Sequence, residues 1–386
     1  MTKGGIFLKA LVLGCGLIGS TIALDLSADL DVTVMDPSEK SLDWIRKRAD
    51  VKAIQASAAD FDMLDEAAAA ADITCVALPC AFEGPVMRRL IETGHNFCSP
   101  SGYLNGEGLD DLAKHHGVTA VFDMGVAPGM SNYLVARGAA LLDELDEGRI
   151  YVGGIPDRLD PPFNYRTVFC LADTLTEYVF PAHHVENGRK VAAEALSGLE
   201  HVEFPGVGTL EAFFTDGLRS GADNIKGRVV FEKTLRYPGY AEQMKLLRHM
   251  GLFDAEPVEV DGAKVSPRAM VAALLGPLWT LAPEKGEADL TVMRVIAKGP
   301  RGGDTVTYTW ELFDRLDEKT GIHSMARTTA FPCTITARAI ADGTIRNRGF
   351  IAPEMLAGNE AFYGMLMSGL KARGVKFSET TCVTRA

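Results

Sequence analysis

Three glycines near the amino end of the chain have the spacing of a phosphate-binding loop. The segment GCGLIG places them at Gly14, Gly16 and Gly19, between an apolar run at 10–13 and a stretch with helical spacing of apolar residues at 20–30. In this pattern the first glycine allows a tight turn, the second lets the backbone approach a pyrophosphate, and the third lets the helix pack on the strand. The pattern predicts that dinucleotide phosphates bind at the amino end of the helix.

An acidic residue ends the next predicted strand. The segment DVTVMD places Asp36 20 positions beyond Gly16. A carboxylate there accepts hydrogen bonds from the ribose hydroxyls of the adenosine and repels a 2′-phosphate. Because Pro37 and Ser38 follow, in place of an arginine that would pair with such a phosphate, we predict NAD rather than NADP as the cofactor.

Other residues near the predicted loop and strand ends are candidates for cofactor contacts. The carboxyl ends of the strands form the edge of the sheet at which a dinucleotide binds. The candidates are Leu17 and Ile18 in the loop, Asp60 and Phe61 after the third strand on the adenine side, and Leu78 and Pro79 after the fourth strand on the nicotinamide side. Asp60 has an equally good alternative interpretation as the N-cap of the helix that begins with Phe61.

The elements around these residues alternate between strand and helix, which is typical of a doubly wound parallel sheet. The predicted strands lie in VKAIQ at 51–55, DITCVALPC at 72–80, HNFCSPS at 95–101 and VTAVFDMGVAPG at 118–129. Farther along, strands are expected at 151–154, 228–232, 290–297 and 306–313, and the last 50 or so residues return to helical periodicity. The fold class is therefore α/β, a Rossmann sheet with a second, α+β domain.

Sequence blocks distributed over nearly the whole chain resemble a known family. They are DMGVAPGMSN at 123–132, GGIPDRLDPPFNY at 153–165, DTLTEYVFPAHHVENGR at 173–189, KTLRYPGYAEQM at 233–244 and TTAFPCTITARAIADGTIRNRGFIAPE at 328–354. The chain thereby resembles the saccharopine dehydrogenase-like family, and it is most similar to the lysine 6-dehydrogenase branch. The resemblance implies a Rossmann domain built from 1–127 and 331–386, with a substrate-binding and dimerisation domain inserted at 128–330. The APG at 127–129 and the AFPC at 330–333 are expected to be hinges.

The family implies oxidation at a carbon that bears an amine, and this chemistry directs attention to carboxylates. Loss of a hydride leaves an iminium cation, which a nearby carboxylate stabilises. Asp123 ends a Rossmann strand at the edge where ligands bind, and Glu177 lies beside a phenol in LTEYVFP. Tyr103, in the loop after CSPSG, is a third catalytic candidate. Each has a structural alternative: a turn acid for Asp123, a solvated acid for Glu177 and a packing residue for Tyr103.

The expected substrate-binding residues are Asn164, Tyr165, Tyr178 and Arg236. A planar guanidinium matches a carboxylate better than a lysine does, so Arg236 is the expected clamp for the substrate carboxylate, with an interdomain ion pair as its alternative role. His183 and His184 are adjacent on a predicted strand, so at most one of them faces a site. No metal site is predicted.

The composition excludes some other classes of protein. The formal net charge of −12 over 386 residues argues against a nucleic-acid partner, and the apolar runs are shorter than the ~18 residues of a membrane span. The seven cysteines have no spacing that suggests zinc or a disulfide framework. We expect a cytoplasmic protein of two domains, and the family resemblance adds a homodimer.

The expected function is that of an NAD-dependent oxidoreductase acting on the CH–NH or CH–NH2 group of an amino acid. The resemblance favours L-lysine 6-dehydrogenase, an oxidative deamination at the ε-carbon. A saccharopine, other opine-type or carboxynorspermidine dehydrogenase is the alternative within the family. An alternative of another class is a non-catalytic sensor that binds NAD and a small amine, because a fold does not establish an activity.

Overall fold

The computed structural model describes residues 2–3, 6–101, 108–167, 171–282 and 285–385. These residues form two compact units. The first contains residues 1–133 and 326–376, and the second contains residues 134–325 and 377–386. Among the described residues, no helix has the length and apolar character needed to cross a membrane.

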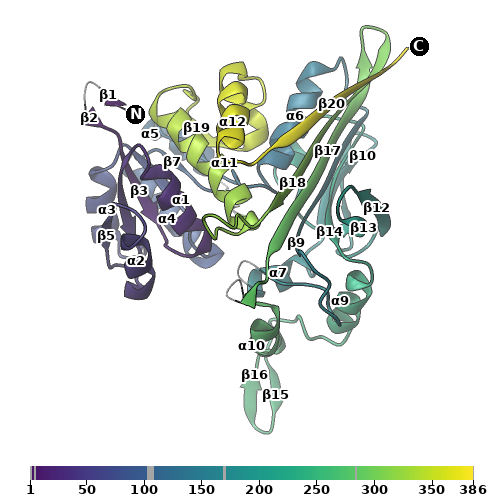
Figure 1. The fold of residues 1–386 in the computed structure, drawn as a ribbon, viewed down its shortest axis with the longest axis horizontal. Coiled ribbons are helices and arrows are strands. Elements are labelled where there is room, and N and C mark those ends of the chain that lie inside the picture. The colour runs from purple at the N-terminus through teal and green to yellow at the C-terminus, as the bar shows by residue number, and fades with distance from the viewer. Residues whose placement is uncertain (1, 4–5, 102–107, 168–170, 283–284, 386) are drawn as a thin grey trace. The chain divides into compact units, whose positions relative to one another are not determined.

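The first unit is built on a seven-stranded parallel sheet with helices around it (Figure 1). Its central strands are almost entirely buried and apolar, as expected for strands covered on both faces. In sheet order the strands are β19 (Gly349–Ile351), β8 (Thr119–Val121), β7 (Phe97–Cys98), β6 (Ile73–Val76), β3 (Lys9–Leu13), β4 (Asp31–Met35) and β5 (Lys52–Ile54). The helices that lie wholly in this unit are α1 (Leu17–Leu26), α2 (Glu39–Arg46), α3 (Phe61–Ala69), α4 (Cys80–Glu92), α5 (Leu109–His116) and α12 (Glu360–Ala372). Helices α6 (Met130–Leu141) and α11 (Ser324–Ala341) each have residues in both units.

The strand order reverses at β3, which lies between β4 and β6. Ligands of doubly wound sheets bind at the carboxyl ends of the strands at such a reversal. The predicted doubly wound sheet is therefore confirmed, and the glycine loop after β3 lies at the expected position. Two short strands, β1 (Thr2–Lys3) and β2 (Ile6–Phe7), precede the sheet.

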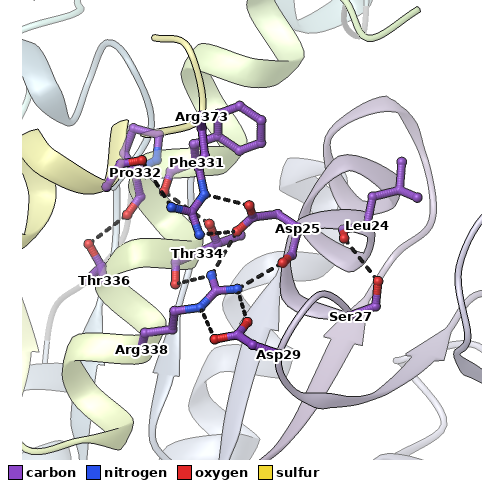
Figure 2. Close-up of polar contacts among 11 residues, drawn as sticks. Leu24, Asp25, Ser27, Asp29, Phe331, Pro332, Thr334, Thr336, Arg338 and Arg373 are labelled. Carbon is purple, nitrogen blue, oxygen red and sulfur yellow. Dashed lines mark hydrogen bonds and ion pairs between the residues drawn. The ribbon is translucent and has the colours of Figure 1, made fainter. Parts of the chain in front are cut away.

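A partly buried ionic network joins the late helices of this unit to α1 (Figure 2). Arg338 of α11 donates to the carboxylates of Asp25 at 2.8 Å and Asp29 at 2.5 Å, and Arg373 at the end of α12 donates to Asp25 at 2.5 Å. The Arg338 side chain is 5% exposed and that of Asp25 is 10% exposed. Burial alone would raise the pKa of Asp25, but the hydrogen bond from Arg373 and the two guanidinium charges lower it below its usual value.

Asp25→Asn is expected to lower the free energy of unfolding by about 2–4 kcal/mol, because it leaves the largely buried Arg373 without its carboxylate partner and leaves Arg338 with Asp29 alone. Since the pKa of Asp25 is lowered on folding, its stabilisation is present above about pH 4 and is lost as the pH falls below that value. When thermal unfolding is measured from pH 3 to 6, the unfolding temperature of the variant should fall less steeply with decreasing pH than that of the wild type. Glu39→Gln, which breaks the exposed pair with Arg46, should leave the unfolding temperature unchanged. An unfolding temperature that falls as steeply with decreasing pH in Asp25→Asn as in the wild type would contradict this account.

The second unit contains a nine-stranded, mostly antiparallel sheet in which β9 pairs parallel with β14 and antiparallel with β17 (Figure 1). Its strands are β9 (Glu147–Pro156), β10 (Ala182–Glu186), β11 (Arg189–Ala193), β12 (Glu200–Phe204), β13 (Gly208–Phe214), β14 (Val229–Arg236), β17 (Asp289–Arg301), β18 (Asp304–Arg315) and β20 (Phe377–Thr384). The other elements are α7 (Leu171–Glu177), α8 (Gly221–Asn224), α9 (Tyr240–His249), α10 (Pro267–Trp279) and the hairpin of β15 (Val258–Val260) and β16 (Ala263–Val265).

Two expectations about the domain boundaries are wrong. Residues 377–386 do not belong to the Rossmann unit, because β20 pairs with β18 of the second unit. The AFPC segment is not a hinge loop either, since it lies within α11, which accommodates Pro332. The two units divide near residues 133 and 325 instead of at 127 and 330.

Candidate active site: a nucleotide loop and a buried polar stripe

The backbone of the glycine loop has no room for side chains at two of its three glycines. Gly14 has φ +92°, and a Cβ atom there would lie 2.2 Å from the carbonyl oxygen of Ala77. A Cβ atom at Gly19 would lie 2.1 Å from the carbonyl oxygen of Gly14. Gly16 differs, because it is exposed and a Cβ atom there would meet no protein atom within 4 Å. The loop is therefore packed tightly against the sheet and open at the position where a pyrophosphate would approach.

The amino end of α1 suits an anion. Its N-cap is Gly16, which supplies no side-chain acceptor, and its first turn contains no acidic residue. The first backbone N–H groups of a helix lack intrahelical partners, and the helix dipole favours negative charge there. Leu17 is exposed and Ile18 is half-buried beside this end. The amino end of α1 therefore fits the phosphates of a dinucleotide.

Asp36 follows β4 and lies against the loop. Its carboxylate accepts the backbone N–H of Cys15 at 2.6 Å and that of Ser38 at 2.7 Å. Burial and the charge of Asp36 raise the pKa of the Cys15 thiol to about 11, so this thiol is neutral at pH 7. The Asp36 side chain is only half-buried, and it can still accept hydrogen bonds from a ligand.

The four remaining cofactor candidates of this unit lie after β5 and β6. Asp60 is the N-cap of α3, where its carboxylate accepts a hydrogen bond from the backbone N–H of Met63 at 3.3 Å. This contact agrees with the alternative interpretation of Asp60 as a helix cap. Phe61 is 38% exposed. Leu78 is half-buried, and Pro79 is the exposed N-cap of α4.

Asp123 occupies an unusual backbone position just after β8. It is 2% exposed, and its φ of +53° lies in the left-handed region that residues other than glycine rarely adopt. Its backbone N–H donates to the carbonyl of Ser101 at 2.9 Å, which holds it to the segment after β7. Strained backbone of this kind is concentrated at functional sites. Tyr103 lies outside the described residues.

In the second unit, alternate residues of β14 place Glu232, Thr234 and Arg236 on one face of the sheet. Thr215, just after β13, donates a hydrogen bond from its hydroxyl to Glu232 at 2.9 Å and contacts the Thr234 hydroxyl at 2.8 Å. We call these four residues the polar stripe. All of them are more than nine-tenths buried.

Tyrosines surround Arg236 at one end of the polar stripe. Its guanidinium lies 4.8 Å from the ring centre of Tyr165 and 5.8 Å from that of Tyr240, and it donates to the Tyr178 hydroxyl at 3.4 Å. Burial disfavours its charge, but the tyrosines and Glu177 more than compensate and raise its pKa. The Nε of Arg236 is buried and has no hydrogen-bond partner. Such a donor is suited to a carboxylate ligand.

The structure thus brings Tyr165, Tyr178 and Arg236 together, and Glu177 ends α7 directly before Tyr178. Asn164 precedes Tyr165 with φ +52°, and its Oδ1 is buried without a partner. Among the described residues, the contacts of Arg236 lie within the second unit and include no ion pair, so they do not support its alternative role as an interdomain ion pair.

Glu232 is a further member of this site that is not among the residues predicted from the sequence. It is 3% exposed, and burial together with the charge of Glu177 raises its pKa to about 8, while the hydrogen bond from Thr215 and the charge of Arg236 act in the opposite direction. It is therefore mostly protonated at pH 7. The available signal was its spacing of four residues from Arg236 on one strand, which places both side chains on the same face.

The two histidines of β10 have separate partners. His183 pairs with Asp216 at 3.0 Å, and His184 stacks on Phe214 with ring centres 4.7 Å apart. Within the described ranges, no group of three or more histidine, cysteine or acidic side chains is arranged to hold a metal ion.

Comparison with known proteins identifies the family of these two units. Residues 10–121 match the saccharopine dehydrogenase NADP binding domain, and residues 125–375 match the saccharopine dehydrogenase C-terminal domain. The chain belongs to the saccharopine dehydrogenase family. This is a family of amino acid dehydrogenases, which are oxidoreductases, and its members bind a nicotinamide dinucleotide.

The individual proteins that this chain matches are distant from it in sequence. Mitochondrial alpha-aminoadipic semialdehyde synthase of Rattus norvegicus is 20% identical over 97% of this chain and 48% of its own length. The NADP+, L-glutamate-forming saccharopine dehydrogenase of Saccharomyces cerevisiae is 22% identical over 89% of this chain and 93% of its own length. The chain spans about half the length of the first curated relatives it matches.

Solved structures share the fold of this chain. The apo saccharopine dehydrogenase of Saccharomyces cerevisiae superposes with a TM-score of 0.80 at 21% identity and covers 97% of this chain and 100% of its own. The homospermidine synthase of Legionella pneumophila, solved with NAD, gives a TM-score of 0.61 at 11% identity and covers 97% and 91%. These likenesses confirm the predicted fold class.

Proposed function

We propose that the chain is an NAD-dependent dehydrogenase that oxidises a carbon–nitrogen bond of an amino acid. The observation that carries the proposal is Arg236, whose buried guanidinium has an Nε without a partner inside a cage of tyrosines. Burying an arginine donor without an acceptor is unfavourable, and a substrate carboxylate would supply the acceptor. The glycine loop of the same chain would hold the dinucleotide.

The side chains of this chain would bind the substrate and stabilise charge during the reaction. A bound nicotinamide dinucleotide supplies the hydride acceptor. When a carbon that bears an amine loses hydride, an iminium cation forms, and a carboxylate would stabilise it. Asp123 of the first unit and Glu177 of the second unit are the candidates for this role. Water adds to the iminium carbon and ammonia leaves, which yields the aldehyde. One of these carboxylates would accept the proton released by the water.

Within this class we propose L-lysine as the substrate, oxidised at its ε-carbon to the semialdehyde, which can cyclise. Saccharopine is the second candidate, because the Saccharomyces cerevisiae relative is named for it. The two substrates share the hydride step and differ in the groups beyond the reacting nitrogen. NADH formation measured with L-lysine, saccharopine, ornithine and carboxynorspermidine tests the proposal. Turnover of saccharopine in place of lysine would move the assignment to the second candidate.

We also propose that the chain prefers NAD to NADP, and we base this on Asp36. Its carboxylate is half-exposed at the end of β4, where it would repel a 2′-phosphate. Asp36→Asn is expected to reduce the ratio of NADPH to NADH dissociation constants by about 100-fold, because the repulsive charge is removed. Fluorescence titration with both reduced cofactors measures this ratio. Asp31→Asn, at the other end of β4, should not change it, and an unchanged ratio in Asp36→Asn would refute the proposed preference.

A further inference from the structure

Glu232 is a buried acid without a cationic partner. Its carboxyl group receives hydrogen bonds from the Thr215 hydroxyl at 2.9 Å, the Thr234 hydroxyl at 3.4 Å and the backbone N–H of Gly217. Among the described residues, no lysine, arginine or histidine forms an ion pair with it. Because a buried carboxylate without a counter-charge is costly, the group is held in its neutral form in the free protein, and a cationic group of a ligand beside it would favour its ionisation.

The position of Glu232 relative to Arg236 suggests where that cation would lie in a ligand. The two residues are four positions apart on β14, which corresponds to about 13 Å along the strand, and both side chains point to the same face. One end of the polar stripe therefore offers a guanidinium, and the other end offers a carboxyl group. This arrangement is complementary to a molecule with a carboxylate at one end and an ammonium at the other.

The surroundings of the polar stripe also contain polar atoms that lack partners. In addition to the Nε of Arg236, the Oε1 of Gln243 and the Nε1 of Trp279 are buried without hydrogen bonds. Gln243 lies on α9, three residues after Tyr240, and the Trp279 ring is 4.9 Å from that of Tyr165. Unsatisfied buried polar atoms are rare in native proteins, and three of those among the described residues belong to Arg236 and to residues next to its tyrosines, which supports a ligand site there.

We propose that Glu232 is a specificity-determining residue that binds a cationic amine of a substrate whose carboxylate is held by Arg236. The substrate class would be the diamino monocarboxylic acids. This inference rests on the proposed function, which it deepens by assigning recognition of the distal amine, which is borne by the ε-carbon of lysine, to a residue. Glu232 would hold this amine when the substrate binds, whereas Asp123 and Glu177 are the candidates for stabilising the iminium that forms from it.

A purely structural role for Glu232 is the competing explanation, since its carboxyl group joins β14 to the segment after β13 through Thr215. The two roles differ in their dependence on charge. Glutamine retains the shape and an acceptor for the Thr215 hydroxyl, but it cannot become negative. Glu232→Gln should therefore preserve the structural role and abolish the recognition of a cation.

The experiment is calorimetric titration of the NADH-bound protein with L-lysine and with L-norleucine, which lacks the distal amine. The wild type should bind lysine at least about tenfold more tightly than norleucine, and Glu232→Gln should bind the two equally. Glu200→Gln is the matched control, because Glu200 pairs with Lys233, whose side chain lies on the opposite face of β14. It should retain the wild-type preference.

A second readout needs no variant. Because the pKa of Glu232 is raised to about 8, lysine binding near pH 7 should release close to one proton, as carboxyl ionisation accompanies the arrival of the ammonium. Titrations in two buffers with different ionisation enthalpies measure this number, and norleucine should release none. Equal proton release by both ligands, or a lysine preference that persists in Glu232→Gln, would overturn the inference, as would a wild type that does not prefer lysine.

The outcome is separable from that of the proposed function, because binding is measured without turnover. A lysine preference that depends on Glu232, without NADH formation from any amine, would support the inference and reject the proposed dehydrogenase. Turnover of lysine with an unchanged preference in Glu232→Gln would retain the dehydrogenase and reject the inference.

Discussion

Asp123→Asn is expected to lower kcat for amine oxidation by about 10²- to 10⁴-fold and to leave the dissociation constant of NADH within about threefold of wild type. The loss follows from the removal of a negative charge and a proton acceptor at the carboxyl edge of the sheet. Asparagine adopts the left-handed backbone region at least as readily as aspartate, so φ +53° does not oppose the substitution. Steady-state kinetics and fluorescence titration measure the two effects.

The control for this prediction is Asp111→Asn, which neutralises an exposed acid in the first turn of α5. It should leave kcat unchanged. Unfolding temperatures of both variants identify any loss caused by instability. If Asp123→Asn retained the wild-type kcat with the best substrate, Asp123 would have only the structural role of a turn residue.

The glycine loop provides the second large effect, because two of its glycines should respond differently to alanine. Gly16→Ala is expected to weaken NADH binding by about 100-fold or more without changing the unfolding temperature, since its Cβ atom meets no protein atom and would occupy the approach of the pyrophosphate. Gly19→Ala should reduce both binding and stability, because its Cβ atom would lie 2.1 Å from the Gly14 carbonyl oxygen.

Titration with NADH and thermal unfolding of the two variants separate these effects. Wild-type affinity in Gly16→Ala would show that the phosphates do not pass this glycine. An unchanged unfolding temperature in Gly19→Ala would contradict the close packing of α1 against the loop.

The Rossmann unit was predictable because its signals are local. The three glycines, the apolar runs and the acid at the end of β4 each impose a conformation or a charge within a few residues. Asp60 shows the limit of this approach, since an acid before a helix has the same pattern whether it binds a ligand or caps the helix.

The C-terminal strand was not predictable in this way. Seven of the eight residues of β20 are exposed, so FSETTCVT lacks the apolar alternation of a strand with one buried face. Its placement depends on pairing with β18, about 70 residues earlier in the chain. Local periodicity contains no information about a partner so far away in sequence.

The polar stripe was predicted only in part. Arg236, Tyr165 and Tyr178 were predicted because of their chemistry, but Tyr240 was not. The three tyrosines come from separate segments that only the fold brings together. The segment FEKTLR has three charged residues among its six and resembles a solvated strand. Glu232 is buried against Thr215 and Gly217, and Arg236 is buried among tyrosines of other segments, and the strand sequence does not reveal either set of neighbours.

The most direct test of the central claim, hydride transfer from a carbon that bears an amine, is isotopic. The protein is incubated with NAD and L-lysine deuterated at both positions of the ε-carbon, and the reduced cofactor is analysed by mass spectrometry. The proposed function predicts NADH that carries one deuterium, together with the cyclised semialdehyde as product. Tight binding of NAD without reduction by lysine, saccharopine, ornithine or carboxynorspermidine would contradict the claim and favour a protein that binds NAD without catalysis.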